Sequence, residues 1–137
     1  GGNQTGAVNA ALGDTIILRT LASDDVPVEG VVVSFAVATG GGSISVTTDT
    51  SDADGNVKTV WTLGGALGAQ GITASAAGLT GSPLAIAATA TAAAPAVLEI
   101  QAQPTSGIAG AALAPAFSVI ARDAFGNVVP TFADSVV

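Results

Sequence analysis

Two segments rich in β-branched residues constrain the fold of this chain most. Residues 31–39 (VVVSFAVAT) and 57–63 (VKTVWTL) contain no proline or glycine, and apolar side chains alternate along both. Such segments favour β-strands, whose successive side chains point to opposite faces. Aromatic residues make up only 4% of the chain, so the single tryptophan, Trp61, offers the largest burial available to a core. We expect Trp61 to pack across a β-sandwich against one face of the first segment, formed by Val33, Phe35 and Val37.

Turn signals divide the rest of the first ninety residues into further short strands. Segments with strand-like alternation lie at 14–21, 43–46, 71–77 and 84–91, and residues 1–13 are expected to form an irregular lead-in. Between the strands stand clusters of Gly, Asp, Ser and Pro, which interrupt ladders and supply the backbone conformations of tight turns. About seven short strands with a turn roughly every 8–12 residues predict an all-β sandwich, not alternating βα units.

Charge and residue content argue against several classes of function. Three basic and ten acidic residues give a net charge of −7, whereas nucleic acids and anionic membrane surfaces bind clustered Lys and Arg. The chain has no histidine and no cysteine, so the usual nucleophile–base pairs cannot be assembled and an enzyme is not expected. We find no apolar segment typical of a membrane helix and no signal-peptide pattern. The absence of Cys and Met suits a protein exposed outside the cell.

A second copy of the pattern begins after residue 92. Residues 93–96 (AAPA) are interpreted as a linker, and the tripeptide AAL at 111–113 repeats the AAL at 10–12, an offset of 101 residues. With this offset the motif DAFGN at 123–127 falls on the turn before Pro27. The sequence therefore predicts a tandem repeat with a partial second domain, residues 97–137.

The same offset aligns residue 102 with residue 1, so residues 97–101 have no counterpart in the first copy. The first sandwich, residues 1–92, is therefore expected to lack its first strand and to expose an edge. Two explanations stay open: the chain is cut from a longer array, or another copy supplies the strand. In the second case residues 97–137 form a β-ladder with a neighbouring chain, and the strand-exchange candidates are Val97, Leu98 and Ile100.

Several motifs resemble the bacterial immunoglobulin-like repeats of surface proteins, the group that includes invasin- and intimin-type adhesins. Within residues 3–91 they are, in order, GGGSIS, DADGN, VWTLG and GLTGSP. The resemblance implies an immunoglobulin-like β-sandwich in an extracellular, cell-surface array that acts as a stalk, spacer or adhesive filament. Its implied partners are neighbouring repeats, copies of itself or a surface receptor of a host. It implies no catalytic residues.

One cluster of carboxylates has the composition of a metal site. Asp49, Asp52 and Asp54 lie within TDTSDADGN, and several oxygen ligands converging in a loop suit calcium. The glutamate that would complete an EF-hand is absent. The alternative interpretation is a tight turn, in which the sequence Asp-Gly-Asn at 54–56 permits unusual backbone conformations. No other cofactor is expected.

A ligand-binding module is the alternative to a structural role. Loops at one end of the sandwich would then recognise a carbohydrate or a host protein. Such sites usually display exposed aromatic side chains. Phe125 and Phe132 are the candidates that fall in expected loops.

Overall fold

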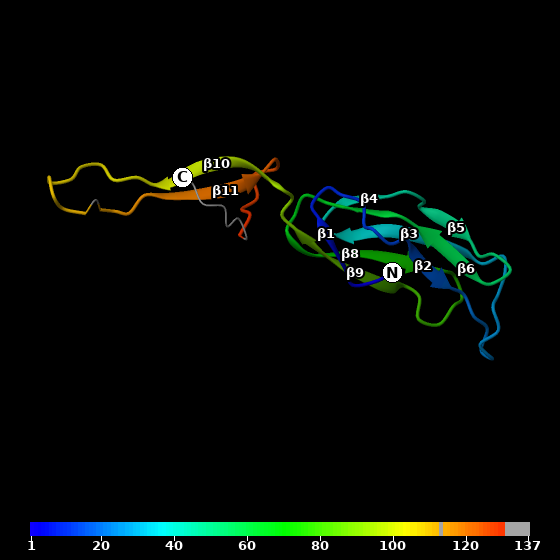
Figure 1. Ribbon diagram of the computed structural model, residues 1–137. Coiled ribbons are helices and arrows are strands. Elements are labelled where there is room, and N and C mark those ends of the chain that lie inside the picture. Colours follow the sequence, from blue (N-terminus) through cyan, green and yellow to red (C-terminus); the bar gives the residue numbers. More distant parts are fainter. Residues whose placement is uncertain (113, 131–137) are drawn as a thin grey trace. The chain divides into compact units, whose positions relative to one another are not determined.

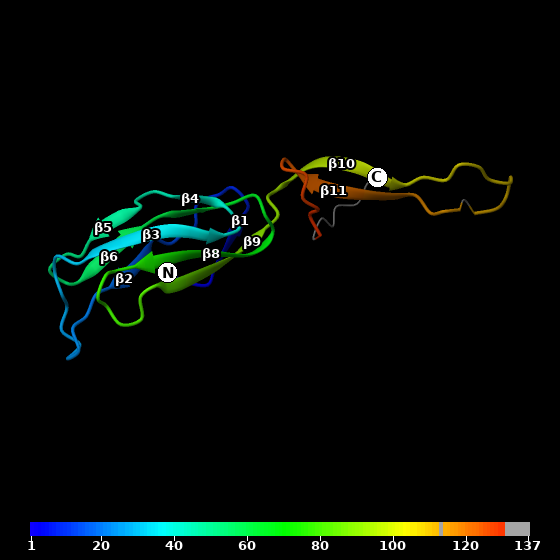
Figure 2. The same ribbon diagram turned by 180° about the vertical axis from the view of Figure 1, so that it is seen from behind.

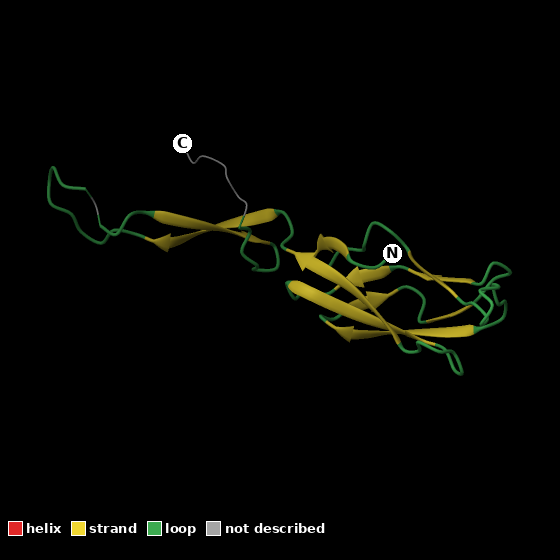
Figure 3. Cartoon of the chain, turned by 90° about the horizontal axis from the view of Figure 1, so that it is seen from below, coloured by secondary structure: helices red, strands yellow, loops and turns green. Residues whose placement is uncertain are grey.

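The computed structural model describes residues 1–112 and 114–130, and within them it contains strands and loops but no helix (Figures 1 and 3). The described residues divide into two compact units, unit 1 (Gly1–Thr91) and unit 2, which begins at Ala92. The strands are β1 (Gln4–Ala7), β2 (Ile16–Arg19), β3 (Val32–Thr39), β4 (Gly42–Ile44), β5 (Thr48–Thr50), β6 (Asn56–Thr59), β7 (Trp61–Leu63), β8 (Gly68–Ser75), β9 (Leu84–Thr91), β10 (Pro95–Ala102) and β11 (Ser118–Asp123).

The first sheet of unit 1 has the strand order β1-β9-β8-β3-β5. Its central strands are antiparallel, but β1 runs parallel to β9, from the pair Gln4↔Ala88 to the pair Ala7↔Thr91 (Figure 2). The expectation of an irregular lead-in was therefore wrong for residues 4–7. These small and polar residues carry no apolar alternation, so their pairing with β9, rather than their own pattern, makes them a strand.

The second sheet of unit 1 is built on both sides of β6 and β7. β2 pairs with β6 and β4 pairs with β7, both antiparallel. Only Val60 separates β6 from β7, and its carbonyl oxygen accepts a hydrogen bond from the Ser45 N–H at 2.9 Å. The strands of this sheet therefore lie side by side in the order β2, then β6 and β7 end to end, then β4. Two such facing sheets make unit 1 a β-sandwich, as the strand count predicted.

The core of unit 1 forms around Trp61, which is fully buried. Val33 and Phe35 are buried as expected, but Val37 is 38% exposed, so that part of the expectation was wrong. The β3–β8 ladder shifts register after Val37, where β3 leaves the core toward the glycine loop at 40–42. Alternation predicts the face of a side chain, but it does not tell where a strand passes the end of the core.

Unit 2 contains one antiparallel strand pair among its described residues, with Leu98 opposite Ala121 and Ile100 opposite Val119. β10 begins at Pro95, within the segment interpreted as a linker. Two strands cannot cover their own apolar side chains, and Leu98 and Ile100 are each 54% exposed. Residues 131–137, which include Phe132, lie outside the described part of the chain.

Backbone hydrogen bonds in the two units repeat with the offset of 101 residues. In unit 1 the Val28 N–H donates to the Thr20 carbonyl at 3.1 Å, and in unit 2 the Val129 N–H donates to the Ala121 carbonyl at 2.9 Å. The bridges Leu21↔Pro27 and Arg122↔Val128 repeat in the same way. β11 and the turn after it are therefore the structural counterparts of β2 and its turn.

Candidate functional site

Asp52 organises the turn between β5 and β6. Its Oδ1 accepts hydrogen bonds from the backbone N–H groups of Asp54 at 3.0 Å and Asn56 at 2.8 Å. The Gly55 N–H donates to the Asp52 carbonyl at 2.8 Å, and Gly55 has a φ of +77°, which glycine adopts without steric cost. DADGN is thus folded as a hairpin turn with an aspartate at its first position.

Asp49 and Asp54 do not complete a ligand set with Asp52. The two carboxylate oxygens of Asp49 accept hydrogen bonds from the N–H groups of Thr50 at 2.9 Å and Lys58 at 2.8 Å. In the described part of the chain no three acidic, histidine or cysteine side chains are grouped so that they could hold a metal ion. The geometry therefore favours the turn interpretation of these carboxylates over the calcium interpretation.

Asp52→Ala is expected to destabilise unit 1 by about 1–2 kcal/mol, because two backbone N–H groups lose their acceptor. Asp52→Asn keeps an acceptor oxygen and should retain most of that stability. Urea unfolding of the full chain, followed by Trp61 fluorescence with and without added calcium, measures both effects. A calcium-dependent gain in stability that both substitutions abolish would contradict the turn interpretation.

The turn after β11 in unit 2 has the same hydrogen-bond pattern as the β5–β6 turn, with Asp123 at its first position. Asp123 Oδ1 accepts hydrogen bonds from the N–H groups of Phe125 at 2.9 Å and Asn127 at 2.8 Å, and Oδ2 accepts one from the Ala93 N–H at 3.0 Å. Burial acts to raise the pKa of this carboxyl. Hydrogen bonds from the Asn127 side chain and from these backbone groups outweigh burial, so the pKa lies below its ordinary value of 3.8.

The lowered pKa of Asp123 gives the turn a defined pH dependence. The ionised Asp123 carboxylate stabilises the turn fully above the ordinary pKa of 3.8. This contribution is lost as the pH falls through the lower pKa of Asp123 in the folded state. The amide resonances of Phe125 and Asn127 should therefore stay at their native positions down to that pH and move only below it. An NMR titration measures this, with Asp123→Asn as the control that removes the step. A midpoint above 3.8 would contradict the assignment.

β2 has an open edge on the side away from β6. Just after β2, the Thr20 N–H donates to the Gly55 carbonyl, and the Thr20 carbonyl accepts from the Val28 N–H. Gly55 and Val28 therefore lie on the same edge of this strand as β6. Gly1 covers the start of the other edge, since a Cβ on Gly1 would lie 3.0 Å from the Ile16 Cα. Among the described residues of unit 1, no strand pairs with this edge beyond that point.

The start of β9 is open as well. β1 pairs with β9 from Ala88 onward, and the Asn3 N–H donates to the Ala87 carbonyl at 2.7 Å. No described residue pairs with Leu84–Ile86 on that side. The two open edges belong to opposite sheets and face the same region of the sandwich.

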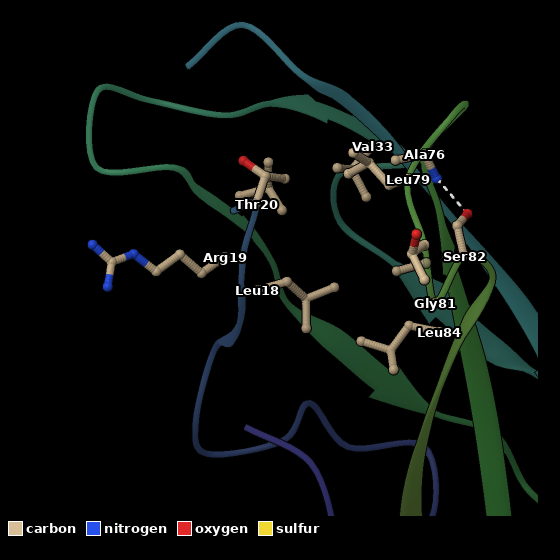
Figure 4. Close-up of a pocket in the computed structure, with 12 residues that line it drawn as sticks. Leu18, Arg19, Thr20, Val33, Ala76, Leu79, Gly81, Ser82 and Leu84 are labelled. Atoms are coloured by element: carbon tan, nitrogen blue, oxygen red, sulfur yellow. Dashed lines mark hydrogen bonds between the residues drawn. The ribbon is translucent and has the colours of Figure 1, made fainter. Parts of the chain in front are cut away.

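An apolar groove of about 210 Å³ lies between these edges (Figure 4). In Figure 4 the Leu18 side chain from β2 and the Leu84 side chain from β9 point into it, while the Arg19 guanidinium points away. Leu79, from the turn between β8 and β9, also lines the groove. Leu84 is 48% exposed there. The groove lies between strands of different sheets, so the sequence alone could not reveal it.

The strand-exchange candidates all lie in β10, and each is more than half exposed: Val97, Leu98 and Ile100. Cross-strand neighbours share a face, so Leu98 and Ile100 lie on the face of Ala121 and Val119. Val97 lies on the opposite face with Glu99, which forms an ion pair with Arg122 at 2.6 Å. Phe125, proposed for ligand recognition, is exposed in the turn after β11.

No protein-family model matches the chain, and no curated protein matches it significantly. The fold is similar to a solved structure, the D0-D1 domain of intimin, with a TM-score of 0.55 and 19% sequence identity. The match covers 74% of this chain and 52% of that structure, so the chain spans about half its length. The described residues include no helix that could cross a membrane. The comparison shows an immunoglobulin-like β-sandwich fold that is similar to part of the D0-D1 domain of intimin.

Proposed function

We propose that the chain is a structural and adhesive repeat of an extracellular bacterial surface protein or filament. The observation that carries this proposal is the strand and turn at β2 that recur at β11 with the same backbone hydrogen bonds. Successive copies of one folding unit suit an array in which each unit contacts its neighbours and the function is mechanical. The likeness to the intimin D0-D1 domain supports a location at the cell surface.

The pairing of β1 with β9 suits a load-bearing role. These are the first and last strands of unit 1, and they are parallel. A pull on the two ends of the unit therefore slides one strand along the other and strains all their hydrogen bonds together. The bonds at the two ends of this ladder are Asn3 N–H to the Ala87 carbonyl at 2.7 Å and Val8 N–H to the Thr91 carbonyl at 2.9 Å.

The unfolding force of single molecules is expected to depend on whether the β1–β9 ladder is loaded along its strands. The chain has no cysteine, so handles can be attached at introduced cysteines in the full chain. Handles at Gly1 and Thr91 should require a severalfold higher unfolding force than handles at Ala66 and Thr91. The second pair loads β8 and β9 from one end, where Gly68 pairs with Ala90, and opens their bonds one after another. Equal forces for the two pairs would contradict a load-bearing β1–β9 ladder.

Surface location has its own test. Antibodies raised against the full chain should stain intact cells of the source organism as strongly as permeabilised cells. Staining that requires permeabilisation would contradict the proposed location. A non-enzymatic role accords with a sequence that has no histidine or cysteine.

A further inference from the structure

We propose that the carboxylate of Asp123 anchors the segment that enters unit 2, so that the free connection between the two units is the single residue Ala92. The inference goes beyond the proposed function and does not depend on where the protein is located. It stands on hydrogen bonds inside each unit and on the comparison of two equivalent turns.

The backbone of unit 1 is held as far as Thr91, the last residue of β9. Thr91 pairs with Ala7 of β1, and its carbonyl oxygen accepts a hydrogen bond from the Val8 N–H at 2.9 Å. The Thr91 hydroxyl donates to the Gly6 carbonyl at 3.2 Å. Unit 1 therefore ends in an anchored strand residue.

Unit 2 holds the chain again two residues later. The Ala93 N–H donates to Oδ2 of Asp123 at 3.0 Å, and Pro95, the first residue of β10, pairs with Asp123. Within residues 1–112 and 114–130, Ala92 makes no backbone hydrogen bond. The two anchored residues are therefore joined by at most about 7 Å of extended chain. Without the bond to Ala93 the free connection would grow to residues 92–94.

The equivalent turn of unit 1 forms without a carboxylate at this position. The offset of 101 residues aligns Asp123 with Ala22. Ala22 makes the same two backbone hydrogen bonds as Asp123, at 2.8 and 3.1 Å in unit 1 and at 2.9 and 3.1 Å in unit 2. A methyl side chain is thus enough to close the turn. The carboxylate of Asp123 adds bonds within its own turn and, outside the turn, the bond to Ala93.

Burial explains why the bond to Ala93 is retained. The Asp123 side chain is buried, and a buried carboxylate is costly unless both oxygens are paired. Oδ1 accepts the N–H groups of Phe125 and Asn127, which leaves Oδ2 for the Asn127 side chain at 3.1 Å and the Ala93 N–H. Bonds to a charged acceptor are stronger than bonds between neutral groups. The carboxylate therefore draws the entering segment onto β11.

Hydrogen exchange in the unmodified full chain is the first test. The Ala93 amide is expected to exchange at least about tenfold more slowly than the Ala92 amide, each rate taken relative to that of an unstructured peptide, because only the Ala93 N–H has to break a bond to exchange. Equal protection of the two amides would overturn the proposal.

Two variants at the same oxygen provide the second test. Asp123→Asn keeps one acceptor oxygen for the turn but replaces the other with an NH2 group, which cannot accept the Ala93 N–H. Asn127→Ala is the matched control, because it removes a side-chain bond to Oδ2 and leaves the bond from Ala93 in place.

A protease that cleaves after alanine measures how free residues 92–94 are. Asp123→Asn should raise the rate of cleavage within this segment at least about tenfold, and Asn127→Ala should change it less than about twofold, because cleavage follows the population of the released segment. Equal rates for Asp123→Asn and the unmodified chain, or a control as fast as Asp123→Asn, would overturn the proposal.

The amide resonances of Leu98 and Ile120 report whether β10 and β11 stay paired in the variants. If Asp123→Asn unfolds unit 2, the exchange of Ala93 in the unmodified chain decides the proposal by itself. The pulling and staining experiments test the structural function separately, since neither depends on the segment at 92–94.

Discussion

Trp61→Ala is expected to lower the stability of unit 1 by about 3–5 kcal/mol, which is enough to unfold a marginally stable domain. Trp61 is fully buried, and its backbone joins both neighbours of β7: it pairs with Ile44, and its carbonyl accepts the Leu12 N–H at 2.9 Å. Removal of the indole would leave a cavity between two sheets whose other buried apolar side chains are aliphatic, apart from Phe35. No second tryptophan or tyrosine exists in the chain to fill it.

Trp61→Phe is the matched control. The indole Nε1 is buried and has no hydrogen-bond partner among the described residues. Phenylalanine loses volume but also removes this unpaired donor, whose burial has its own cost. We therefore expect Phe to cost less than half of what Ala costs. Urea unfolding of the full chain, followed by circular dichroism, measures both variants. A cost for Trp61→Ala below about 1 kcal/mol, the range of surface substitutions and mild changes, would contradict a core built on this residue.

Gly64→Ala is expected to cost about 3 kcal/mol or more, because its Cβ would meet backbone rather than a movable side chain. The added carbon would collide with the Gly40 carbonyl oxygen and lie 2.7 Å from the Gly41 carbonyl carbon and 2.8 Å from the Gly42 nitrogen. Gln70 holds the same loop from inside. Its Oε1 accepts the Gly64 N–H at 2.8 Å, so the loop cannot move aside without losing a buried hydrogen bond.

Gly65→Ala is the control for Gly64→Ala. A Cβ on Gly65 would make ordinary contacts with Asn9 side-chain atoms at 3.6 and 3.7 Å. Its effect should stay within about 0.5 kcal/mol. Thermal unfolding of the full chain should separate the two, with a fall of about 12 °C or more for Gly64→Ala, since 1 kcal/mol corresponds to roughly 4–8 °C in a domain of this size. Equal midpoints for the two variants would show that the loop adapts.

The sequence predicted those parts of the fold that depend on local pattern. Alternation placed Trp61, Val33 and Phe35 in the core, and the structure confirms all three. It failed at Val37, which lies on the correct face of β3 but beyond the end of the core. It also failed at β1, where the residues are small and polar and only the long-range pairing with β9 makes a strand.

The candidate site was less accessible to prediction. Asp49, Asp52 and Asp54 have the composition of a calcium loop, but carboxylates also accept backbone N–H groups, and only coordinates show which use applies. The apolar groove beside β2 depends on where two strands of different sheets stop. That information is not local to any segment. The offset of 101 residues was the one long-range signal in the sequence, and the backbone hydrogen bonds that follow β2 and β11 repeat with it.

The segment from β4 to β5 crosses from one sheet of unit 1 to the other, since β4 pairs with β7 and β5 pairs with β3. Backbone also crosses on the side of the groove, because residues 8–12 lead from β1, which pairs with β9, to the edge of β7, where the Leu12 N–H donates to the Trp61 carbonyl at 2.9 Å. Both sides of the sandwich are therefore closed by a crossing segment. Local opening of unit 1 should be confined to the groove between Leu18 and Leu84, where fluctuations lose the fewest contacts.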